Sequence, residues 1–451
     1  MSMVPTPDEI FLNKTPNSLE WYERAVRIFP GGISHNIRHF SPRPFYTQKA
    51  KGKFLYDVDD NKYVDYWMGH WALILGHSPD IVVHTLNKQI LHGTLYGTTN
   101  GCSVKLGELI QKSVPSIELM RFCTTGSEAT MYACRLARAF TGRRIVAKAI
   151  GGWHGFNTDL MESVNYPFDL CEGLGLIKGE TKYVQSIPFN DLEGSIKHLD
   201  KIKEDVACII IEPLLGGAGC IPASIEYLRG LSEYCTRNNI NLIMDEIVTG
   251  YRFGFGTMSE QFKIEPDLFT LGKIVGGGLP IGVVGGKKEL MQISDPIMNK
   301  DKNKRCFIGG GTFSSNPLTM SAGLATLDFL NKNKTRIYPK INELGERTRT
   351  GLSKIFSDYK VDVETTGKGS LFLTHFLNDK IRIIRNAYDV ALATDGRLHK
   401  YHLALMSLFG IFFLPSKMGA ISAKHSEVDV QKLITATTQI LESGILSSKN
   451  N

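Results

Sequence analysis

The sequence lacks a long apolar segment: nowhere in its 451 residues do 18 apolar residues follow one another. Because a helix needs about 20 such residues to cross a bilayer, we expect no membrane-spanning helix. The first 16 residues, MSMVPTPDEIFLNKTP, mix proline with acidic residues, whereas a secretory signal needs a basic start and an apolar run. These absences favour a cytoplasmic protein that does not associate with membranes.

Paired cysteines are also missing, since no two of the eight cysteines form a Cys-x-x-Cys motif. This spacing suits neither a zinc ribbon nor a disulfide framework, so we expect free thiols in a reducing compartment and no metal site. The cysteines are Cys102, Cys123, Cys134, Cys171, Cys208, Cys220, Cys235 and Cys306.

The chain has no basic block of the kind that binds nucleic acid. Its 52 Lys and Arg residues against 45 Asp and Glu residues give a net charge of +7, which supports at most a mild attraction for acidic metabolites. Neither Gly-x-Gly-x-x-Gly after a first strand nor Gly-x-x-x-x-Gly-Lys-[Ser/Thr] occurs. We therefore expect no nucleic-acid partner and disfavour a nucleotide-binding enzyme.

The middle of the chain alternates short apolar segments with helical patterns, which predicts a parallel sheet flanked by helices. Residues 208–211 and 242–244 are continuously apolar, as expected for strands buried on both faces. The expected strands are 120–124, 144–150, 206–212, 240–245, 267–271 and 281–285, and the expected helices are 128–140, 225–238 and 316–330.

The two ends of the chain have a different pattern. Residues 53–68 predict a hairpin that turns at 59–61, and residues 341–446 predict a smaller α+β unit. We therefore expect an α/β protein with a large, mostly parallel-sheet domain and a smaller α+β domain formed by both termini. The expected helices of the C-terminal part are 341–357, 381–396 and 427–443, and the expected boundaries are 1–75 for an N-terminal segment that contributes to the small domain and the active-site entrance, 76–335 for the large domain and 336–451 for the C-terminal small domain.

An apolar strand ends in two carboxylates, Asp245 and Glu246. In an open parallel sheet, the carboxyl edge is where ligands bind. The alternative explanation is an aspartate that only caps the next turn.

A single lysine, Lys273, stands between an apolar strand and the glycine run 276–278. A partly buried lysine has a lowered pKa and can form a Schiff base with a carbonyl group. The alternative is a surface lysine with a buried stem.

The segment Thr-Thr-Gly-Ser-Glu over residues 124–128 predicts a strand, a glycine turn and a helix start. Free N–H groups and hydroxyls at such a turn make an anion site that could hold a phosphate. Plain N-capping by Ser127 or Thr125 explains the same residues without a ligand.

Together these features match the needs of pyridoxal phosphate (PLP): a phosphate cradle, a carboxylate for the pyridinium nitrogen and a Schiff-base lysine. Trp153 and His154 follow another expected strand, and the indole offers a flat face on which the ring could stack. For Trp153 core packing is an equal alternative, and for His154 a structural role is the simpler local explanation.

Three motifs carry a resemblance to a known family. They are Thr-Gly-Ser-Glu-Ala at 125–129, Asp-Glu-Ile-Val-Thr-Gly-Tyr-Arg at 245–252, and Leu-Gly-Lys at 271–273 with its Gly-Gly-Gly-Leu-Pro tail. The chain resembles the class III aminotransferases of PLP fold type I from about residue 30 to residue 330. Within the class it is similar to the glutamate-1-semialdehyde 2,1-aminomutase subgroup, through residues 31–38, 67–69, 75–77 and 311–317.

The resemblance implies catalytic and cofactor roles. Lys273 would hold the cofactor as a Schiff base and move the proton, and Asp245 would pair with the pyridinium nitrogen. Ile247 would pack behind the ring. Gly126 and Ser127 would bind the phosphate.

The resemblance also implies a shared site and a substrate anchor. Thr312 would reach the phosphate from a neighbouring subunit, which implies a homodimer. Trp153 stands where the family has a stacking tyrosine, with His154 beside it in the cofactor site. Arg38 would bind the substrate carboxylate, with His35 close by.

Three positions depart from the aminomutase pattern. His35 replaces a serine, Gly217 replaces an asparagine, and the segment 415–420 lacks the gating glutamate that follows Pro-Ser. Without this gate, we expect amino-group transfer between a small carboxylate-bearing amino acid and an oxo acid, with PLP and pyridoxamine phosphate as the two cofactor forms. The alternative is the aminomutase itself, which makes 5-aminolevulinate for tetrapyrrole synthesis; a lesser alternative is an amino-acid racemase, and a non-catalytic PLP-binding regulator is disfavoured.

Overall fold

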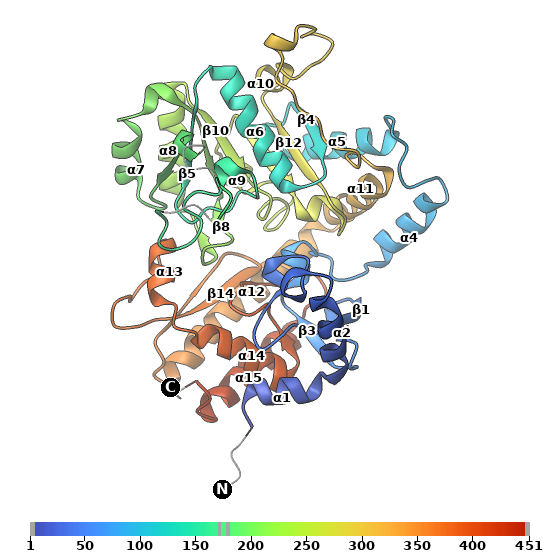
Figure 1. Cartoon of the computed structure of the whole chain (residues 1–451), viewed down its shortest axis with the longest axis vertical. Helices are drawn as coiled ribbons and strands as arrows, with labels where there is room; N and C mark the ends of the chain where they lie inside the picture. The colour runs from blue at the N-terminus through green and yellow to red at the C-terminus, as the bar shows by residue number, and fades with distance from the viewer. Residues whose placement is uncertain (1–4, 170–172, 177–180, 447–451) are drawn as a thin grey trace. The chain divides into compact units, whose positions relative to one another are not determined.

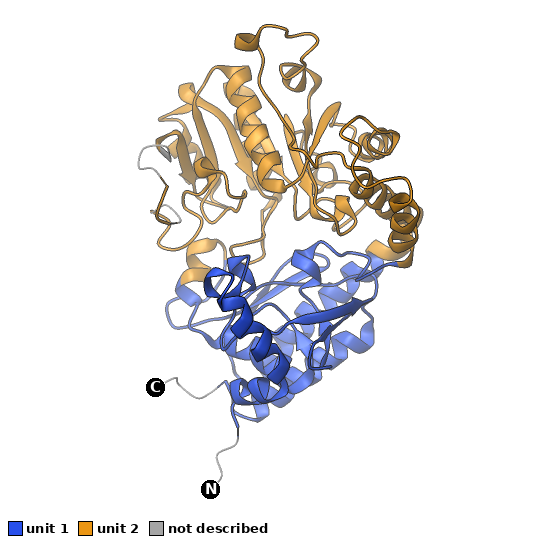
Figure 2. Cartoon of the chain, turned by 45° about the vertical axis from the view of Figure 1, so that its right-hand side comes forward, with its two compact units in different colours: residues 1–79, 339–384, 392–451 blue, residues 80–338, 385–391 orange. Residues whose placement is uncertain are grey.

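The computed structural model describes residues 5–169, 173–176 and 181–446. The chain divides into two compact units (Figure 2): unit 1 comprises Met1–Pro79, Pro339–Ile384 and Leu392–Asn451, and unit 2 comprises Asp80–Tyr338 and Arg385–Ala391. In the described part of the chain, no helix is both long and apolar enough to span a bilayer. Seven cysteines are free thiols, and Cys171 lies outside the described residues.

Unit 2 contains a seven-stranded sheet with the order β4-β12-β11-β10-β7-β5-β6. Neighbouring strands are parallel except at β12, which is antiparallel to both β11 and β4. The mostly parallel sheet is therefore confirmed. The strands are β4 (Leu119–Cys123), β5 (Ile145–Ala149), β6 (Val184–Ile187), β7 (Val206–Ile211), β10 (Asn241–Asp245), β11 (Leu268–Gly272) and β12 (Gly282–Gly286), and a separate hairpin pairs β8 (Leu214–Leu215) with β9 (Ile221–Pro222).

Helices flank this sheet (Figure 1), and all three helices expected in unit 2 are confirmed within a few residues. Helix α6 packs across β7, β10, β11 and β12, while α11 packs against α4 and α5. Small side chains such as Ala129 and Ala133 let α6 approach the buried Ile210 and Ile243. The helices are α4 (Asp80–Ile90), α5 (Gly101–Ser113), α6 (Gly126–Thr141), α7 (Leu192–Leu199), α8 (Ile225–Asn238), α9 (Met258–Phe262), α10 (Lys288–Gln292) and α11 (Pro317–Lys332), with short 3₁₀ turns η3 (Thr158–Leu160), η4 (Thr181–Tyr183), η5 (Lys203–Asp205), η6 (Lys273–Gly276) and η7 (Lys302–Lys304).

Unit 1 combines two small sheets from distant parts of the sequence. The first has the order β1-β2-β3-β15, in which β2 and β3 form the expected hairpin and β15 joins β3 in parallel. The second has the order β13-β14-β16. The strands are β1 (Thr47–Lys51), β2 (Phe54–Asp57), β3 (Lys62–Asp65), β13 (Val363–Thr366), β14 (Leu371–Phe376), β15 (Ile411–Phe412) and β16 (Gly419–Ala420).

The prediction of one helix over residues 381–396 is wrong. Residues 387–393 form α13, and a new helix, α14, starts after Gly396, whose φ of +84° ends any continuous helix at that point. Only a residue without a side chain adopts this conformation at no steric cost. The remaining helices are α1 (Pro7–Lys14), α2 (Pro16–Val26), α3 (Met68–Trp71), α12 (Lys334–Asp358), α13 (Ala387–Ala393), α14 (Arg397–Phe409) and α15 (Glu427–Glu442), with η1 (Pro30–Gly32) and η2 (Asn36–Arg38).

Candidate active site

Three neighbouring strands of unit 2 deliver charged residues to one edge of the sheet. Asp245 ends β10, Glu212 follows β7, and Lys273 follows β11. Because these strands run parallel, their carboxyl ends meet at the same edge. The exposed fractions of Asp245 and Glu212 are only 3% and 4%, and Lys273 is partly buried.

The Asp245 carboxylate accepts three hydrogen bonds. One oxygen accepts from Thr270 Oγ1 at 2.9 Å and from the Ile247 N–H at 3.2 Å. The other lies 2.7 Å from His154 Nδ1. Burial lowers the pKa of His154 although Asp245 acts in the opposite direction, so the ring is neutral at pH 7. Since an ionised carboxylate only accepts, Nδ1 must carry the proton.

Lys273 is held in an unusual backbone conformation at the start of η6. Its φ is +47°, in the left-handed region, and such strain is typical of functional positions. Helix α11 packs closely on η6. Glycine at 323 allows this approach, since a Cβ atom there would lie 2.2 Å from the Val275 carbonyl oxygen. Burial lowers the pKa of Lys273, and Arg252 adds to this effect. The lowered pKa increases the fraction of neutral amine, the form that attacks a carbonyl group.

The turn before α6 presents free backbone donors. Thr125 caps the helix by accepting the Glu128 N–H at 3.2 Å, and the Glu128 carboxylate accepts the N–H groups of Thr124 and Thr125, each at 2.8 Å. The N–H groups of Gly126 and Ser127 have no acceptor among the described residues. The N-cap therefore leaves two donors that could bind an anion, so capping does not exclude the expected phosphate site.

Glycines bring this turn close to its neighbours. A Cβ atom at Gly155 would lie 2.3 Å from Ser127 Oγ, and one at Gly126 would lie 2.6 Å from Ile247 Cδ1. The Ser127 hydroxyl accepts the Phe156 N–H at 3.1 Å. The structure thus brings Gly126, Ser127 and Ile247 together beside Asp245.

Trp153 and His154 lie in the segment that follows β5. The Trp153 N–H donates to Glu212 Oε1 at 2.9 Å, and its half-buried ring meets Phe156 edge-on at 5.1 Å. A Cβ atom at Gly217 would lie 3.4 Å from Trp153 Cβ, an ordinary van der Waals contact, so Gly217 lies next to Trp153.

Thr312 is exposed on the loop that leads into α11. The Thr124 hydroxyl donates to the Gly310 carbonyl at 3.4 Å, and Asn100 Nδ2 donates to the Ser315 carbonyl at 2.7 Å. The loop is therefore anchored beside the turn that precedes α6 and at the N-cap of α5.

His35 and Arg38 belong to unit 1, whereas Lys273 belongs to unit 2. Arg38 lies in η2 and lines a cavity of about 490 Å³ whose walls include Trp67 and His70. The rings of His35 and His70 stack, with centroids 5.4 Å apart and planes 5° from parallel. Burial, followed by the charge of Arg38, lowers the pKa of His35. The charged and titratable residues that line this mainly apolar cavity include Arg38, Asp65, His70 and His77.

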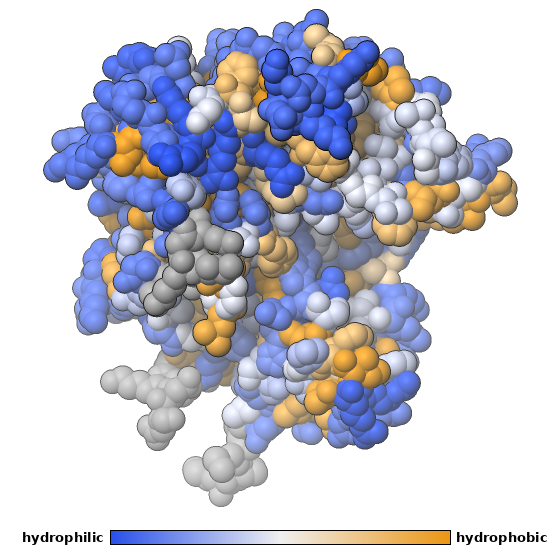
Figure 3. All heavy atoms as spheres, turned by 45° about the horizontal axis from the view of Figure 1, so that its top comes forward, coloured by the Kyte–Doolittle hydropathy of each residue, from blue (hydrophilic) through white to orange (hydrophobic). Residues whose placement is uncertain are grey.

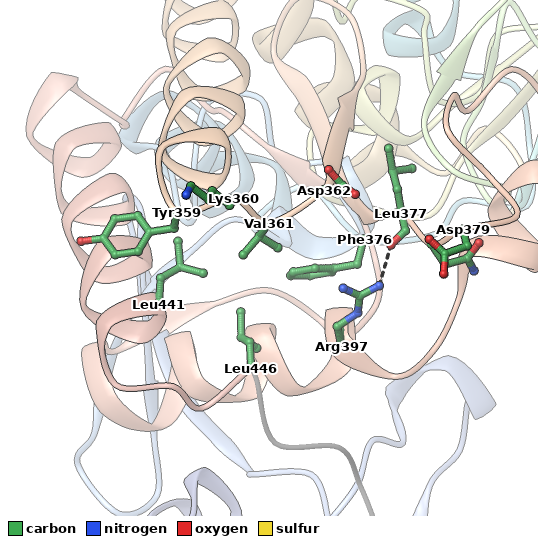
Figure 4. A pocket seen from close by; sticks show the side chains of 11 residues that line it. Tyr359, Lys360, Val361, Asp362, Phe376, Leu377, Asp379, Arg397, Leu441 and Leu446 are labelled. Atoms are coloured by element: carbon green, nitrogen blue, oxygen red, sulfur yellow. Dashed lines mark hydrogen bonds between the residues drawn. The ribbon is translucent and has the colours of Figure 1, made fainter.

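A second cavity of unit 1, about 450 Å³ in volume, lies between the ends of α12, β14 and α15 (Figure 4). Arg397 donates to the Leu377 carbonyl at 2.7 Å and pairs with Asp395. Asp362 pairs with Arg382 at 2.9 Å. Because its charges are paired locally, this cavity indicates no particular ligand.

Glu212 belongs to the site although sequence reasoning did not select it. Its signal is the same as that of Asp245: a carboxylate placed directly after a fully apolar strand. Burial, with the charge of Asp245, raises the pKa of Glu212 to about 8.

Comparison with known proteins shows to which family the chain belongs. Residues 37–404 match the aminotransferase class-III family. The chain belongs to this family. It is a PLP-dependent enzyme of fold type I, and its resemblance at the sequence level is confirmed.

The chain is similar both to proteins named aminomutases and to solved structures of transaminases. It is 38% identical to a glutamate-1-semialdehyde 2,1-aminomutase of Methanosarcina acetivorans, over 96% of this chain and 99% of that protein. It is 36% identical to the enzyme of the same name from Archaeoglobus fulgidus, over 95% and 100% of the two chains. A solved structure of a transaminase with PLP bound is 30% identical, with a TM-score of 0.86 over 96% of this chain and 98% of the other.

The residues of unit 2 fit this cofactor. The two free N–H groups suit a phosphate, the glycine at 155 keeps the cradle open, and a carboxylate and an amine stand at the same sheet edge. PLP needs these three groups from its protein.

We expect Gly155→Ala to weaken PLP binding about tenfold or more, because the added methyl group would collide with Ser127 Oγ in the cradle. Gly142→Ala is the matched control: its φ of +70° imposes a similar backbone strain, but nothing lies within 4 Å of the added atom. Dissociation constants from titration of the visible absorbance would check this. Equal PLP affinities in the two variants would contradict the assigned cradle.

Proposed function

We propose that this chain is a glutamate-1-semialdehyde 2,1-aminomutase, which moves an amino group within its substrate to give 5-aminolevulinate. The observation that supports this function is the similarity to aminomutases over almost the whole length of both chains. The sequence alone favoured an intermolecular transaminase, and the comparisons support the alternative better.

The proposed roles in unit 2 follow from the site geometry. When bound, PLP supplies an aldehyde and an electron-withdrawing ring that takes up the electron pair left on a substrate carbon. The N–H groups of Gly126 and Ser127 bind the phosphate at the start of α6, where the helix dipole favours an anion. Asp245, held by His154 and Thr270, would pair with the ring nitrogen and keep it protonated.

Lys273 is the proposed nucleophile and proton carrier. As a neutral amine it would hold PLP through the cofactor aldehyde, and as a free amine it would accept a proton from the substrate carbon and return it at another atom. Its burial-lowered pKa suits both tasks. Trp153 and Ile247 pack on the ring from its two sides in this proposal.

Arg38 is the proposed anchor for the substrate carboxylate. Its planar guanidinium matches a carboxylate with two parallel hydrogen bonds, and the cavity that it lines offers few other charged groups. His35 and His70 stack beside this position.

One specific observation keeps transamination as a second candidate. After Pro415 and Ser416, the chain continues with Lys417 and lacks the gating glutamate of the aminomutase pattern; burial lowers the pKa of Lys417. An aminomutase must retain its diamine intermediate, whereas a transaminase must release its oxo product.

The deciding experiment supplies glutamate-1-semialdehyde to the pyridoxamine phosphate form without any other amino donor or acceptor. We expect sustained formation of 5-aminolevulinate over many turnovers, well above an enzyme-free control, and none above that control with Lys273→Ala. Formation of about one equivalent of the diamine per site, without 5-aminolevulinate, would support the transaminase instead, because release of the diamine leaves the PLP form and no donor is present to regenerate the amino form.

For Arg38→Ala we expect KM for the carboxylate substrate to rise about 10- to 100-fold with a smaller change in kcat, since a charge-assisted hydrogen bond is worth about 1.5–3 kcal/mol. Arg27→Ala, at an exposed arginine in the same unit, is the control and should leave KM unchanged. Steady-state kinetics would check this. An unaltered KM in Arg38→Ala would remove Arg38 from the substrate site.

A homodimer with shared sites is also part of the proposal. The Thr312 loop carries the exposed Phe313 (59% exposed), and the neighbouring start of α5 carries the exposed Val104 (60%); Leu91, directly after α4, is also exposed (84%). Figure 3 shows apolar side chains gathered at the right-hand edge, the side on which α4 lies in Figure 1. Such a surface is typical of a face covered by a second copy.

Subunit mixing tests whether Thr312 acts across this interface. Thr312→Asp should repel the phosphate, and Lys273→Ala removes the amine, so each variant alone should be inactive. If Thr312 serves its partner's site, exchange of equal amounts of the two variants restores one intact site per mixed dimer, about one quarter of the wild-type activity. No recovery after proven subunit exchange would place Thr312 in its own chain's site or outside both sites.

A further inference from the structure

Glu212 and Asp245 form a pair of buried carboxyl groups on adjacent strands. Ile211 of β7 is paired in register with Met244 of β10, so the next residue on each strand is one of the two acids. Adjacent strands lie about 4.8 Å apart, and both acids are almost fully buried. Asp245 disfavours the ionisation of Glu212, and water has little access to either carboxyl group, so the pair favours holding one proton.

The donors around the pair are unequal. Asp245 accepts from a histidine, a hydroxyl and a backbone N–H. Among the described residues, the donors to Glu212 are two backbone N–H groups, those of Trp153 at 2.9 Å and Gly216 at 3.1 Å. Three donors, one of them an imidazole, stabilise a negative charge better than two amides. The geometry therefore places the proton on Glu212.

We propose that Glu212 is a positioning residue that carries a proton at neutral pH, so that Asp245 alone faces the cofactor as a carboxylate. In this role Glu212 fixes the backbone of Trp153 and of the Gly216 turn without adding a second negative charge to the site. The inference rests on the proposed roles of Lys273 and Asp245 toward PLP.

The charged and titratable groups that act on Glu212 come from three neighbouring segments. Asp245 on β10 disfavours its ionisation, and Lys273 after β11 favours it. Arg252 acts on Lys273, and the imidazole of His154 is neutral. The charge that Glu212 gains on ionisation, near pH 8, would favour a positive charge at Lys273 and would raise the pKa of the bond between this lysine and bound PLP.

Glu212→Gln in the holoenzyme tests this division of roles, because glutamine keeps the shape of the neutral acid. We expect PLP affinity at pH 7 within about threefold of wild type, since no charge is lost. In titrations of the visible absorbance from pH 6 to pH 10, the wild type should show two coupled ionisations, one near pH 8, and the variant only one, at a lower pH. Infrared difference spectra at pH 7 should show a protonated carboxyl group that the variant lacks.

Asp267→Asn is the matched control. Asp267 lies at the opposite end of the same sheet, where it accepts the Leu242 N–H at 2.7 Å, so its loss should leave both ionisations in place. If Glu212→Gln does not fold, Asp245→Asn gives the same test, because removing the neighbouring charge should move the ionisation near pH 8 to lower pH.

Three results would overturn the inference: a tenfold or greater loss of PLP affinity at pH 7 in a folded Glu212→Gln variant, an unchanged ionisation near pH 8 in that variant, or an unchanged ionisation in Asp245→Asn. Failure of the underlying proposal looks different. A wild-type holoenzyme without a visible band that borohydride bleaches would refute the role of Lys273, whereas an intact band with any of the three results refutes only the role of Glu212.

Discussion

A buried carboxylate needs hydrogen-bond donors, and Asp245 obtains them from three different segments of unit 2. Thr270 lies opposite it in the register of β10 and β11, His154 comes from the segment after β5, and the Ile247 N–H comes from its own turn. These donors can converge only if the three strands are parallel and in this register. The same strand arrangement places Lys273 beside Asp245. The packing that supplies hydrogen-bond donors to the buried carboxylate therefore also positions the amine that the chemistry needs.

Much of unit 2 could be predicted from the sequence because its signals are local. Continuous apolar strands, a carboxylate at a strand end and a glycine turn before a helix each require only neighbouring residues, and Asp245, Lys273 and the 124–128 turn lie where the pattern places them. The antiparallel direction of β12 was not visible, because an apolar strand has the same composition in either direction. Glu212 was missed as a site residue because its importance depends on Asp245 in the neighbouring strand, a relation set by register.

Unit 1 was less predictable for a similar reason. Its sheets join segments that lie far apart in the sequence, and the break between α13 and α14 depends on a single glycine in a left-handed conformation. His35 was expected as a simple substitution near the substrate carboxylate, but the structure stacks it on His70, a contact that no local pattern encodes. The departure at His35 therefore alters a contact as well as a residue type, while the family assignment rests on residues 37–404.

The pairing of β15 with β3 has a consequence for how the protein is made. Strand β3 ends at Asp65, and its parallel partner begins at Ile411, so the ribosome must add about 350 residues before this sheet can be completed. At about 5–20 residues per second, the delay is on the order of tens of seconds. Most of unit 2 leaves the ribosome during that interval and can fold first, while the N-terminal strands of unit 1 wait with an unpaired edge. The late arrival of the last segment makes the nascent chain, rather than the finished enzyme, the state most exposed to aggregation and most dependent on chaperones.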